Sequence, residues 1–152
     1  MKPGKCSDWI LRIKSIEKEY RVATLARDAL DAELKKAPST LVGKGLERLH
    51  FDRFSDNLDA TYLIRMFAEF ETGLRDCWKK RLKKRSIARV SDLVISISSK
   101  QRIDSQEREN VEKVRRYRNK LIHEEDSEAE TVDVAAARKL LCTFFGRLPE
   151  DW

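Results

Sequence analysis

Residues 63–77 read LIRMFAEFETGLRDC, and their apolar members repeat at the spacing of an α-helix. Positions three and four apart lie on the same face of a helix, so these side chains form one broad apolar stripe. The stripe consists of Leu63, Met66, Phe67, Phe70, Leu74 and Cys77. It predicts a central helix that begins near residues 57–59 and runs to about Lys84. Gly73 lies in or beside the stripe, where the lack of a side chain lets another helix approach closely.

A long helix is also predicted before this one, over residues 8–36, with Ser7 or Asp8 as its N-cap. Its apolar positions are Ile13, Ile16, Tyr20, Ala23, Leu30 and Leu34. A loop is predicted between the two helices, because Pro38 ends the first and two glycines follow it. In that loop, Leu46, Leu49 and Phe51 are expected to dock on the core.

Three further helices are predicted towards the C-terminus. A short one starts near Ser91-Asp92, where β-branched residues make a short strand the alternative. The next starts at Asp104 or Ser105, with Glu107 at the position of a capping box, and runs to about His123. The last starts at Thr131 or Asp133 and stops at Leu148-Pro149, with Val134, Leu141, Phe144, Phe145 and Leu148 pointing inward. The expected fold is all-α: an antiparallel bundle of four to five helices in one domain over residues 1–152, with the long first helix at about 8–36 and the core of the bundle at about 57–149.

The composition excludes several classes of protein. Among the 152 residues, no run approaches the roughly 20 apolar positions of a membrane span. The N-terminus lacks the uninterrupted apolar segment of a signal peptide, so a cytoplasmic protein is expected. The three cysteines are read as small buried hydrophobes, and the two histidines leave almost nothing for a metal site. No metal and no cofactor are expected.

The charge is concentrated in the middle of the chain. The chain carries a net +6, but residues 79–120 alone hold 15 basic and 5 acidic side chains, a net +10. The segments before and after them carry +1 and −5. Such a segment attracts phosphates or an acidic partner, or else it is a solvated helix face. Lys80, Lys83 and Lys84 belong to its densest run.

The predicted helix over residues 105–123 places one arginine among core positions. On a helical wheel, Val111, Val114, Tyr117, Leu121 and Ile122 share one apolar arc, and Arg118 falls inside it. Asn119 and His123 are i,i+4 neighbours on the shoulder of that arc, one turn after Arg115.

This arrangement has two interpretations. In the structural one, Arg118 pairs with a carboxylate such as Glu71, and His123 closes the end of the helix. In the functional one, a permanently charged phosphate binder and a residue type that titrates near neutral pH share a cleft suited to phosphoryl chemistry.

Residues 118–123, Arg118-Asn119-Lys120-Leu121-Ile122-His123, resemble the R-N-x-x-x-H motif of HEPN (higher eukaryotes and prokaryotes nucleotide-binding) domains. Residues 61–71 are similar to the hydrophobic second helix of that family, and residues 140–149 to its closing helix. The resemblance covers roughly residues 58–149.

The resemblance implies a helical bundle that dimerises, so that two copies of the motif face each other. In catalytic members this composite cleft is a metal-independent endoribonuclease site, often in toxins of toxin–antitoxin or other defence systems. Arg118 would then bind the scissile phosphate, His123 would transfer protons, and Asn119 would orient the pair. Arg115, Arg116 and Lys120 join the three lysines above as expected RNA contacts.

The expected partners are therefore RNA, a second copy of the chain, and an antitoxin or other defence protein, with no membrane. The acids at positions 124–130 are expected to turn away from RNA or to pair with Arg115 and Arg116. The alternative function is a non-catalytic HEPN-like module that binds a nucleotide, a nucleic acid or a protein. A third reading is a simple basic nucleic-acid-binding helical protein, although no helix-turn-helix spacing stands out.

Overall fold

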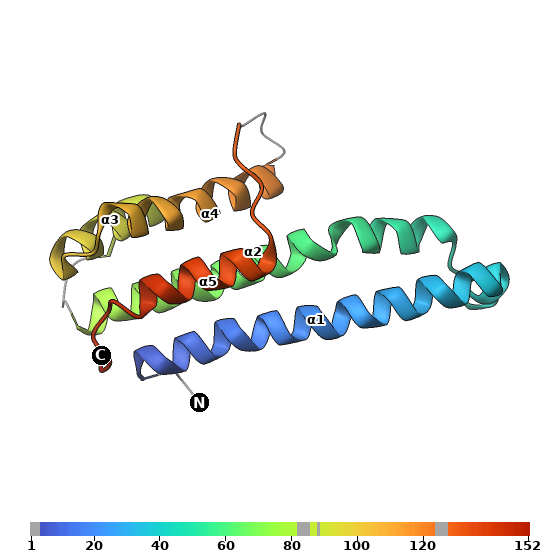
Figure 1. Ribbon diagram of the computed structural model, residues 1–152, viewed down its shortest axis with the longest axis horizontal. Helices are drawn as coiled ribbons and strands as arrows, with labels where there is room; N and C mark the ends of the chain where they lie inside the picture. The colour runs from blue at the N-terminus through green and yellow to red at the C-terminus, as the bar shows by residue number, and fades with distance from the viewer. Residues whose placement is uncertain (1–3, 82–85, 88, 124–127) are drawn as a thin grey trace.

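The computed structural model describes residues 4–81, 86–87, 89–123 and 128–152, which form an all-α protein. Five α-helices and two short 3-10 turns make up the described chain (Figure 1). They are α1 (Cys6–Lys36), η1 (Pro38–Thr40), η2 (Val42–Lys44), α2 (Arg48–Lys80), α3 (Val90–Gln101), α4 (Ser105–His123) and α5 (Val134–Phe145). The predicted all-α class is confirmed for the described residues.

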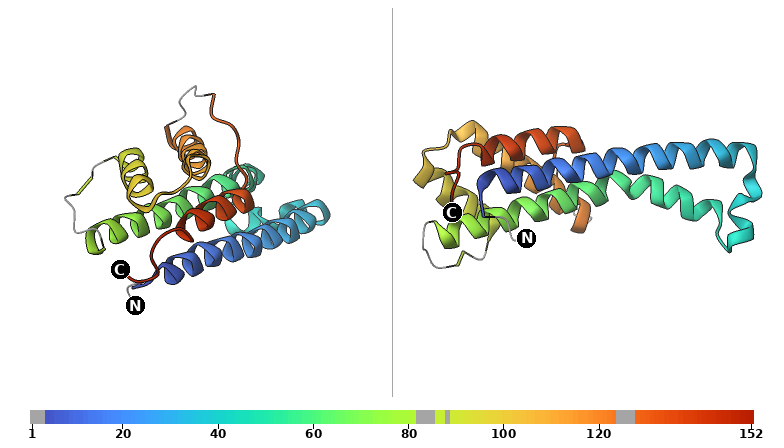
Figure 2. Two further views of the ribbon diagram at one scale, coloured as in Figure 1. Left: turned by 60° about the vertical axis from the view of Figure 1, so that its left-hand side comes forward. Right: turned by 90° about the horizontal axis from the view of Figure 1, so that it is seen from below.

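Helix α2 is the centre of the bundle, because each of the other four α-helices packs against it. Helices α1 and α2 form a long antiparallel pair, and α5 lies along both of them. Helices α3 and α4 cover another side of α2 (Figures 1 and 2). One end of the α1–α2 pair extends beyond α3, α4 and α5, as Figure 2 also shows.

The core is built on the stripe predicted for residues 63–77. All six members of that stripe are buried, and Phe70 lies 5.8 Å from Phe144 and 4.9 Å from Phe145, between ring centroids. At Gly73, side chains of α1 and α5 lie close to the backbone of α2. A Cβ atom at that position would lie 2.6 Å from the Phe145 ring and 2.9 Å from the Trp9 ring. The predicted role of Gly73 is thus confirmed.

Helix α1 begins earlier than predicted. Its N-cap is Lys5, so Ser7 and Asp8 lie inside the helix. The Asp8 carboxylate still serves the helix start, because it accepts hydrogen bonds from the backbone N–H groups of Gly4 at 3.0 Å and Lys5 at 3.2 Å. A carboxylate at the third helical position can satisfy these groups as well as an N-cap can.

Helix α2 begins about ten residues earlier than predicted and ends at Lys80 rather than Lys84. The predicted loop after Gly45 is helical from Arg48 onwards, since the left-handed backbone of Gly45 completes the reversal of the chain. Phe51 packs into a small separate cluster with Leu34 and Leu41. In contrast to the prediction, Leu46 and Leu49 do not dock on the core, because they lie on the outer side and are 43% and 49% exposed.

The C-terminal helices follow the prediction more closely. The segment after Ser91 is helix and not strand. Helix α4 has the predicted bounds, and α5 starts after Asp133, whose side chain accepts a hydrogen bond from the N–H of Ala136 at 2.7 Å. The five positions expected to point inward near the last helix are all buried.

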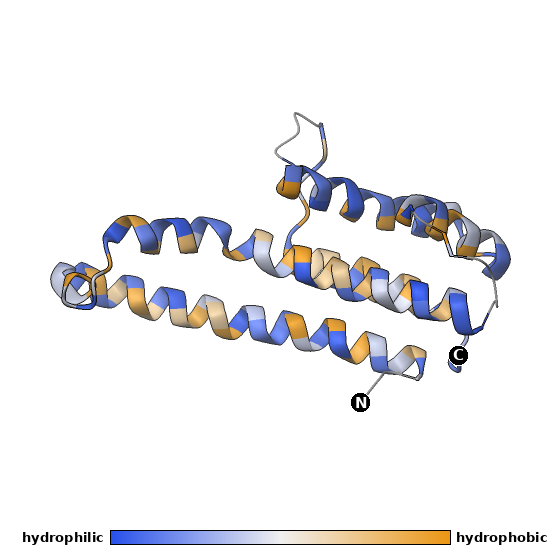
Figure 3. Ribbon diagram, turned by 180° about the vertical axis from the view of Figure 1, so that it is seen from behind, coloured by the Kyte–Doolittle hydropathy of each residue, from blue (hydrophilic) through white to orange (hydrophobic). Residues whose placement is uncertain are grey.

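Hydrophilic and hydrophobic residues alternate along the ribbons of the long helices α1 and α2 (Figure 3). Within the described chain, no helix combines the length and the apolar character needed to cross a membrane.

Candidate functional site

Helix α4 carries the motif residues, and its own sequence fixes its start and its inner face. The side chain of Asp104 accepts a hydrogen bond from the N–H of Gln106 at 2.7 Å, which caps the first turn. Glu107, expected to complete a capping box, instead binds the guanidinium of Arg147. Val111 and Val114 are fully buried and hold the helix on the core.

The last turn of α4 departs from the predicted apolar arc. Tyr117 and Leu121 pack against the core as expected, but Ile122 is 41% exposed. Ile122 lies about 100° around the helix from Leu121, which already faces the core at this level.

Arg118 is half-buried and lies on the face that meets α2. Its Nη1 donates a hydrogen bond to Oδ1 of Asn119 at 2.9 Å, and its guanidinium carbon lies 5.6 Å from the centroid of the Phe67 ring. Its Nε is buried without a hydrogen-bond partner within the described residues. Two of the three predicted catalytic residues are therefore in direct contact.

The predicted pairing of Arg118 with Glu71 is not observed. The Glu71 carboxylate accepts hydrogen bonds from Arg75, at 2.9 Å from Nε and 2.7 Å from Nη2. Arg75 is one turn away on the same helix, so its guanidinium can reach Glu71. Among the described residues, Arg118 forms no ion pair with any carboxylate.

His123 is the last residue of α4, and it is exposed. It follows Asn119 by four positions and therefore lies on the same side of the helix. Arg118 is five positions before it, about 140° around the helix and about 7.5 Å along the axis. Within one copy of the chain, Asn119 thus lies between an inward arginine and an outward histidine.

The two other arginines expected to bind RNA are paired with acids of their own helix. Nε of Arg115 donates to Glu112, and this hydrogen bonding holds the pKa of the Arg115 guanidinium above its ordinary value. Arg116 lies 3.3 Å from Glu109 and 3.7 Å from Glu112. Much of the positive charge of α4 is therefore already balanced.

The expected lysine contacts are divided between two regions. Lys120 is half-buried on α4, within the motif. Lys80 is at the end of α2, where its ammonium lies 2.7 Å from Asp76. Since Phe67 contacts Arg118 and Lys80 is 13 residues further along α2, Lys80 is about 20 Å away along that helix. It does not share a cleft with the motif. Lys83 and Lys84 lie outside the described residues.

A groove runs along the outer face of α4 and has a volume of about 750 Å³. It is lined by Gln106, Glu109, Asn110, Lys113, Arg115, Arg116, Asn119 and residues 128–130. Two of its lining residues form an ion pair, with the ammonium of Lys113 2.7 Å from the Glu130 carboxylate. The acid was expected to pair with Arg115 or Arg116, but Lys113 takes that role. Residues 124–127 lie outside the described chain.

The sequence interpretation missed Gln106, Asn110 and Lys113. A signal was present, because positions 106, 110 and 113 are separated by four and three residues and lie on one helix face. Carboxamide side chains both donate and accept hydrogen bonds, so Gln106, Asn110 and Asn119 equip this groove for polar ligands such as nucleobases.

Comparisons of the chain with protein-family models, with curated proteins and with solved structures found no match. The described residues also contain no group of three or more histidine, cysteine or acidic side chains placed to hold a metal ion. The contacts of α4 thus define a candidate site that consists of Arg118, Asn119 and His123 together with the α4 groove.

Proposed function

We propose that the protein is a metal-independent endoribonuclease of the HEPN type, acting as a homodimer. The proposal rests on one observation, the surroundings of the Arg118 guanidinium. Its positive charge is unbalanced by any carboxylate among the described residues, and its guanidinium is bound to Asn119, which borders a groove of about 750 Å³. A phosphate group of RNA would supply the missing negative charge.

The reaction assigns one task to His123 and one to Arg118. The 2′-hydroxyl of the RNA attacks the adjacent phosphorus, and the bond from phosphorus to the 5′-oxygen of the next nucleotide breaks. His123 takes part in the proton transfer from the 2′-hydroxyl to the leaving oxygen, and Arg118 stabilises the charge that develops on the phosphate. The products are a 2′,3′-cyclic phosphate and a free 5′-hydroxyl.

A second copy of the chain is part of the proposal because of the helix geometry. Arg118 and His123 of one copy lie about 140° apart around α4, so a single helix does not direct both towards one phosphate. Two copies that face each other bring the arginine of one to the histidine of the other. Partnership with an antitoxin or defence protein remains part of this proposal through the HEPN resemblance alone.

The test is RNA cleavage by purified protein in the presence of EDTA. The wild type is expected to release 2′,3′-cyclic phosphate ends, and Arg118→Ala and His123→Ala are each expected to lower the rate by about 10²-fold or more. Arg21→Ala, at an exposed position of α1, is the control and should cleave like the wild type. Equal cleavage by all four proteins contradicts the proposal.

A second candidate function has its own observation. Arg118 rests on the Phe67 ring with its Nε enclosed, as an arginine retained for packing would. The chain would then be a non-catalytic HEPN-like module that binds a nucleotide, a nucleic acid or a protein. This alternative predicts that Arg118→Ala lowers the melting temperature strongly, whereas a stable Arg118→Ala protein without cleavage favours the ribonuclease.

A further inference from the structure

A groove between α1 and α2 lies largely on the arm of the molecule. The arm consists of residues 21–60, the part of the α1–α2 pair that extends beyond α3, α4 and α5 (Figures 1 and 2). This α1–α2 groove has a volume of about 460 Å³, which is within the range of ligand-binding clefts. It is lined by Ala23, Arg53, Phe54, Asn57, Leu58, Thr61, Tyr62 and Arg65.

The α1–α2 groove is separate from the candidate site on α4. Phe67 contacts Arg118, and Phe54 precedes Phe67 by 13 residues, which is about 20 Å along the axis of α2. The two phenylalanines are also about 140° apart around the helix. The α1–α2 groove is therefore a second place on the molecule and not an extension of the α4 groove.

The lining of the α1–α2 groove is basic. Among the described residues that form it, two are arginines and none is an acid. Arg53 is exposed, and within the described chain it forms no ion pair. Arg65 lies 2.6 Å from Glu19 of α1, which is not part of the lining, and the Arg65 side chain is 50% exposed. Even with Glu19 included, the groove has one positive charge without a counterion, so it attracts an anionic ligand.

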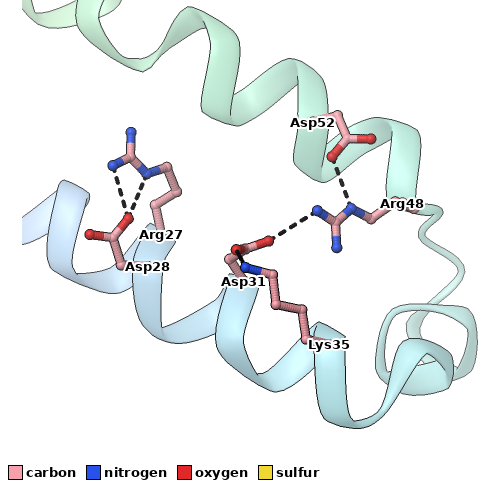
Figure 4. Close-up of polar contacts among 6 residues, drawn as sticks. All are labelled: Arg27, Asp28, Asp31, Lys35, Arg48 and Asp52. Carbon is pink, nitrogen blue, oxygen red and sulfur yellow. Dashed lines mark hydrogen bonds and ion pairs between the residues drawn. The ribbon is translucent and has the colours of Figure 1, made fainter.

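The acids of this part of α2 lie on the other side of the helix, between about 140° and 160° around it from Phe54. They are Asp52, Asp56 and Asp59. Asp52 lies 2.9 Å from Arg48, and Arg48 lies 3.0 Å from Asp31 of α1 (Figure 4). The acidic charge of the arm is therefore kept away from the α1–α2 groove.

An aromatic ring is exposed among the basic side chains of the groove. Phe54 is 46% exposed, whereas the other five phenylalanines of the chain are buried. Tyr62 is half-buried beside it, and the guanidinium carbon of Arg65 lies 5.9 Å from the centroid of the Tyr62 ring. Aromatic rings in a positively charged groove are the arrangement on which single-stranded nucleic acids stack their bases.

The polar side chains of the groove are able to accept hydrogen bonds from a ligand. Nδ2 of Asn57 donates to the carbonyl oxygen of Arg53 at 2.8 Å, and Oγ1 of Thr61 donates to the carbonyl oxygen of Asn57 at 2.8 Å. These bonds use donors and leave Oδ1 of Asn57 and the lone pairs of the Thr61 hydroxyl. The amino groups of bases and the 2′-hydroxyl of RNA are donors that match them.

The length of the groove favours a strand over a single nucleotide. Arg53 and Arg65 are 12 residues apart on α2, which is about 18 Å along the helix axis. A stacked strand rises about 3.4 Å per nucleotide, so the two arginines lie along a stretch of about five nucleotides. The carboxylates of an acidic peptide would also neutralise the arginines, but they bring no planar face to cover the Phe54 ring.

We propose that the α1–α2 groove binds single-stranded RNA, with a base stacked on Phe54 and phosphates bound by Arg53 and Arg65. The inference rests on the proposed function in one respect, because that function makes RNA the strand that the protein handles. The groove holds the RNA on the arm and raises the affinity for it. It takes no part in the cleavage step.

Fluorescence anisotropy of a labelled single-stranded RNA of mixed sequence measures the binding. Every protein carries His123→Ala, which prevents cleavage under the proposed mechanism. Phe54→Ala is expected to raise the dissociation constant at least about fivefold, because one stacked base is lost. Phe54→Tyr keeps the ring and should bind like the parent. Leu25→Ala is the control, since Leu25 is 70% exposed on the arm but lies about 160° around α1 from Ala23.

Arg53→Gln tests the phosphate contact. It should weaken binding and lower the slope of log K against log salt concentration by about 0.7, the value for one phosphate contact on a single strand. Arg21→Gln is the matched control, because it removes the same charge from an exposed position of the arm about 160° around α1 from Ala23. Arg53→Gln also serves if Phe54→Ala loses helicity by circular dichroism.

The inference is overturned if Phe54→Ala and Arg53→Gln bind RNA like the parent, or if the two controls weaken binding equally. Poly-glutamate is the second probe. If it displaces the labelled RNA as well as unlabelled RNA does at equal charge, the groove belongs to an acidic protein and the inference is wrong.

Cleavage by the protein with an intact His123 is measured separately. If the groove variants weaken RNA binding but the wild type never cleaves RNA, the proposed function is contradicted and this inference stays in place. If the wild type cleaves RNA but the groove variants bind it normally, the reverse holds.

Discussion

The guanidinium carbon of Arg118 lies 5.6 Å from the centroid of the Phe67 ring. Phe67 is fully buried on α2, so the ring is a rigid support for a charged group of α4. A cation over an aromatic ring is attracted by the negative face of the ring, with an energy of about 0.5–2 kcal/mol depending on desolvation. The same contact orients the guanidinium, which is the group proposed to bind the phosphate.

Phe67→Leu is therefore expected to impair cleavage without altering any motif residue. The substitution removes the aromatic face below Arg118 and creates a small cavity, so the free energy of unfolding should fall by about 1–2 kcal/mol. Phe144→Leu is the control, because Phe144 is equally buried but lies on α5, where its ring packs against Phe70. If the two variants lose similar stability but Phe67→Leu loses more cleavage activity, the positioning of Arg118 by Phe67 is confirmed. Equal cleavage rates for the two variants would contradict it.

Gly73→Ala is expected to destabilise the bundle by about 1–3 kcal/mol. The added methyl group would lie 2.6 Å from the Phe145 ring and 2.9 Å from the Trp9 ring, so α1 or α5 would have to move. Gly43→Ala is the matched control, since a Cβ atom there meets nothing within 4 Å. Chemical denaturation measures the free energy of unfolding of both variants. A Gly73→Ala protein as stable as the control would show that the three helices are not in close contact at this point.

The buried thiols are expected to make the protein less stable in alkaline solution. Burial raises the pKa of Cys6 from 9.0 to about 12, and that of Cys77 to about 11. At a pH between 9 and these raised pKa values, each thiol is deprotonated in the unfolded chain but stays protonated in the folded chain. Unfolding is therefore favoured as the pH rises above about 9, by up to roughly 1.4 kcal/mol per pH unit for each thiol.

Melting temperatures between pH 8 and pH 10.5 test this expectation. Cys6→Ala should show a smaller decrease over that range than the wild type, although its stability at pH 8 is lower. Thiol reagents at pH 8 should react slowly with Cys6 in the folded protein, because the thiolate is the reactive form. An identical pH dependence in the two proteins would rule out Cys6 as a source of the effect.

Most of the helices could be predicted from the sequence where an apolar stripe and a cap agree. Helix α4 has the predicted bounds because Asp104 caps it and Val111 and Val114 hold it on the core. The start of α2 could not be found in the same way. Residues 48–57 have only Phe51 buried, so no periodic stripe marks this part of the helix.

The site was predictable in position but not in its contacts. The wheel correctly placed Arg118 on the inner side of α4, yet its partners are Asn119 and Phe67 and not Glu71. A long flexible side chain reaches several groups, and the choice among them depends on how two helices are packed together. The partner of Lys113 could not be predicted for the same reason, since the fold brings Glu130 to it.

The contact between Lys113 and Glu130 is expected to limit the binding of RNA to the α4 groove. The charged side chains that line the groove are three basic and three acidic ones, so its net charge is zero. Glu130→Gln removes one negative charge and frees the ammonium of Lys113, which then becomes available to a phosphate. In a His123→Ala background, which prevents cleavage under the proposed mechanism, we expect a dissociation constant for single-stranded RNA that is several-fold lower.

Fluorescence anisotropy with a labelled RNA measures this change, and added salt should diminish it because phosphate contacts release counterions. Glu150→Gln is the control, since it alters the net charge of the chain equally but lies away from the groove. The exposed ion pair itself contributes little to folding, so the melting temperature should hardly change. If both variants bind RNA equally well, the effect comes from overall charge, and the α4 groove is not where the RNA lies.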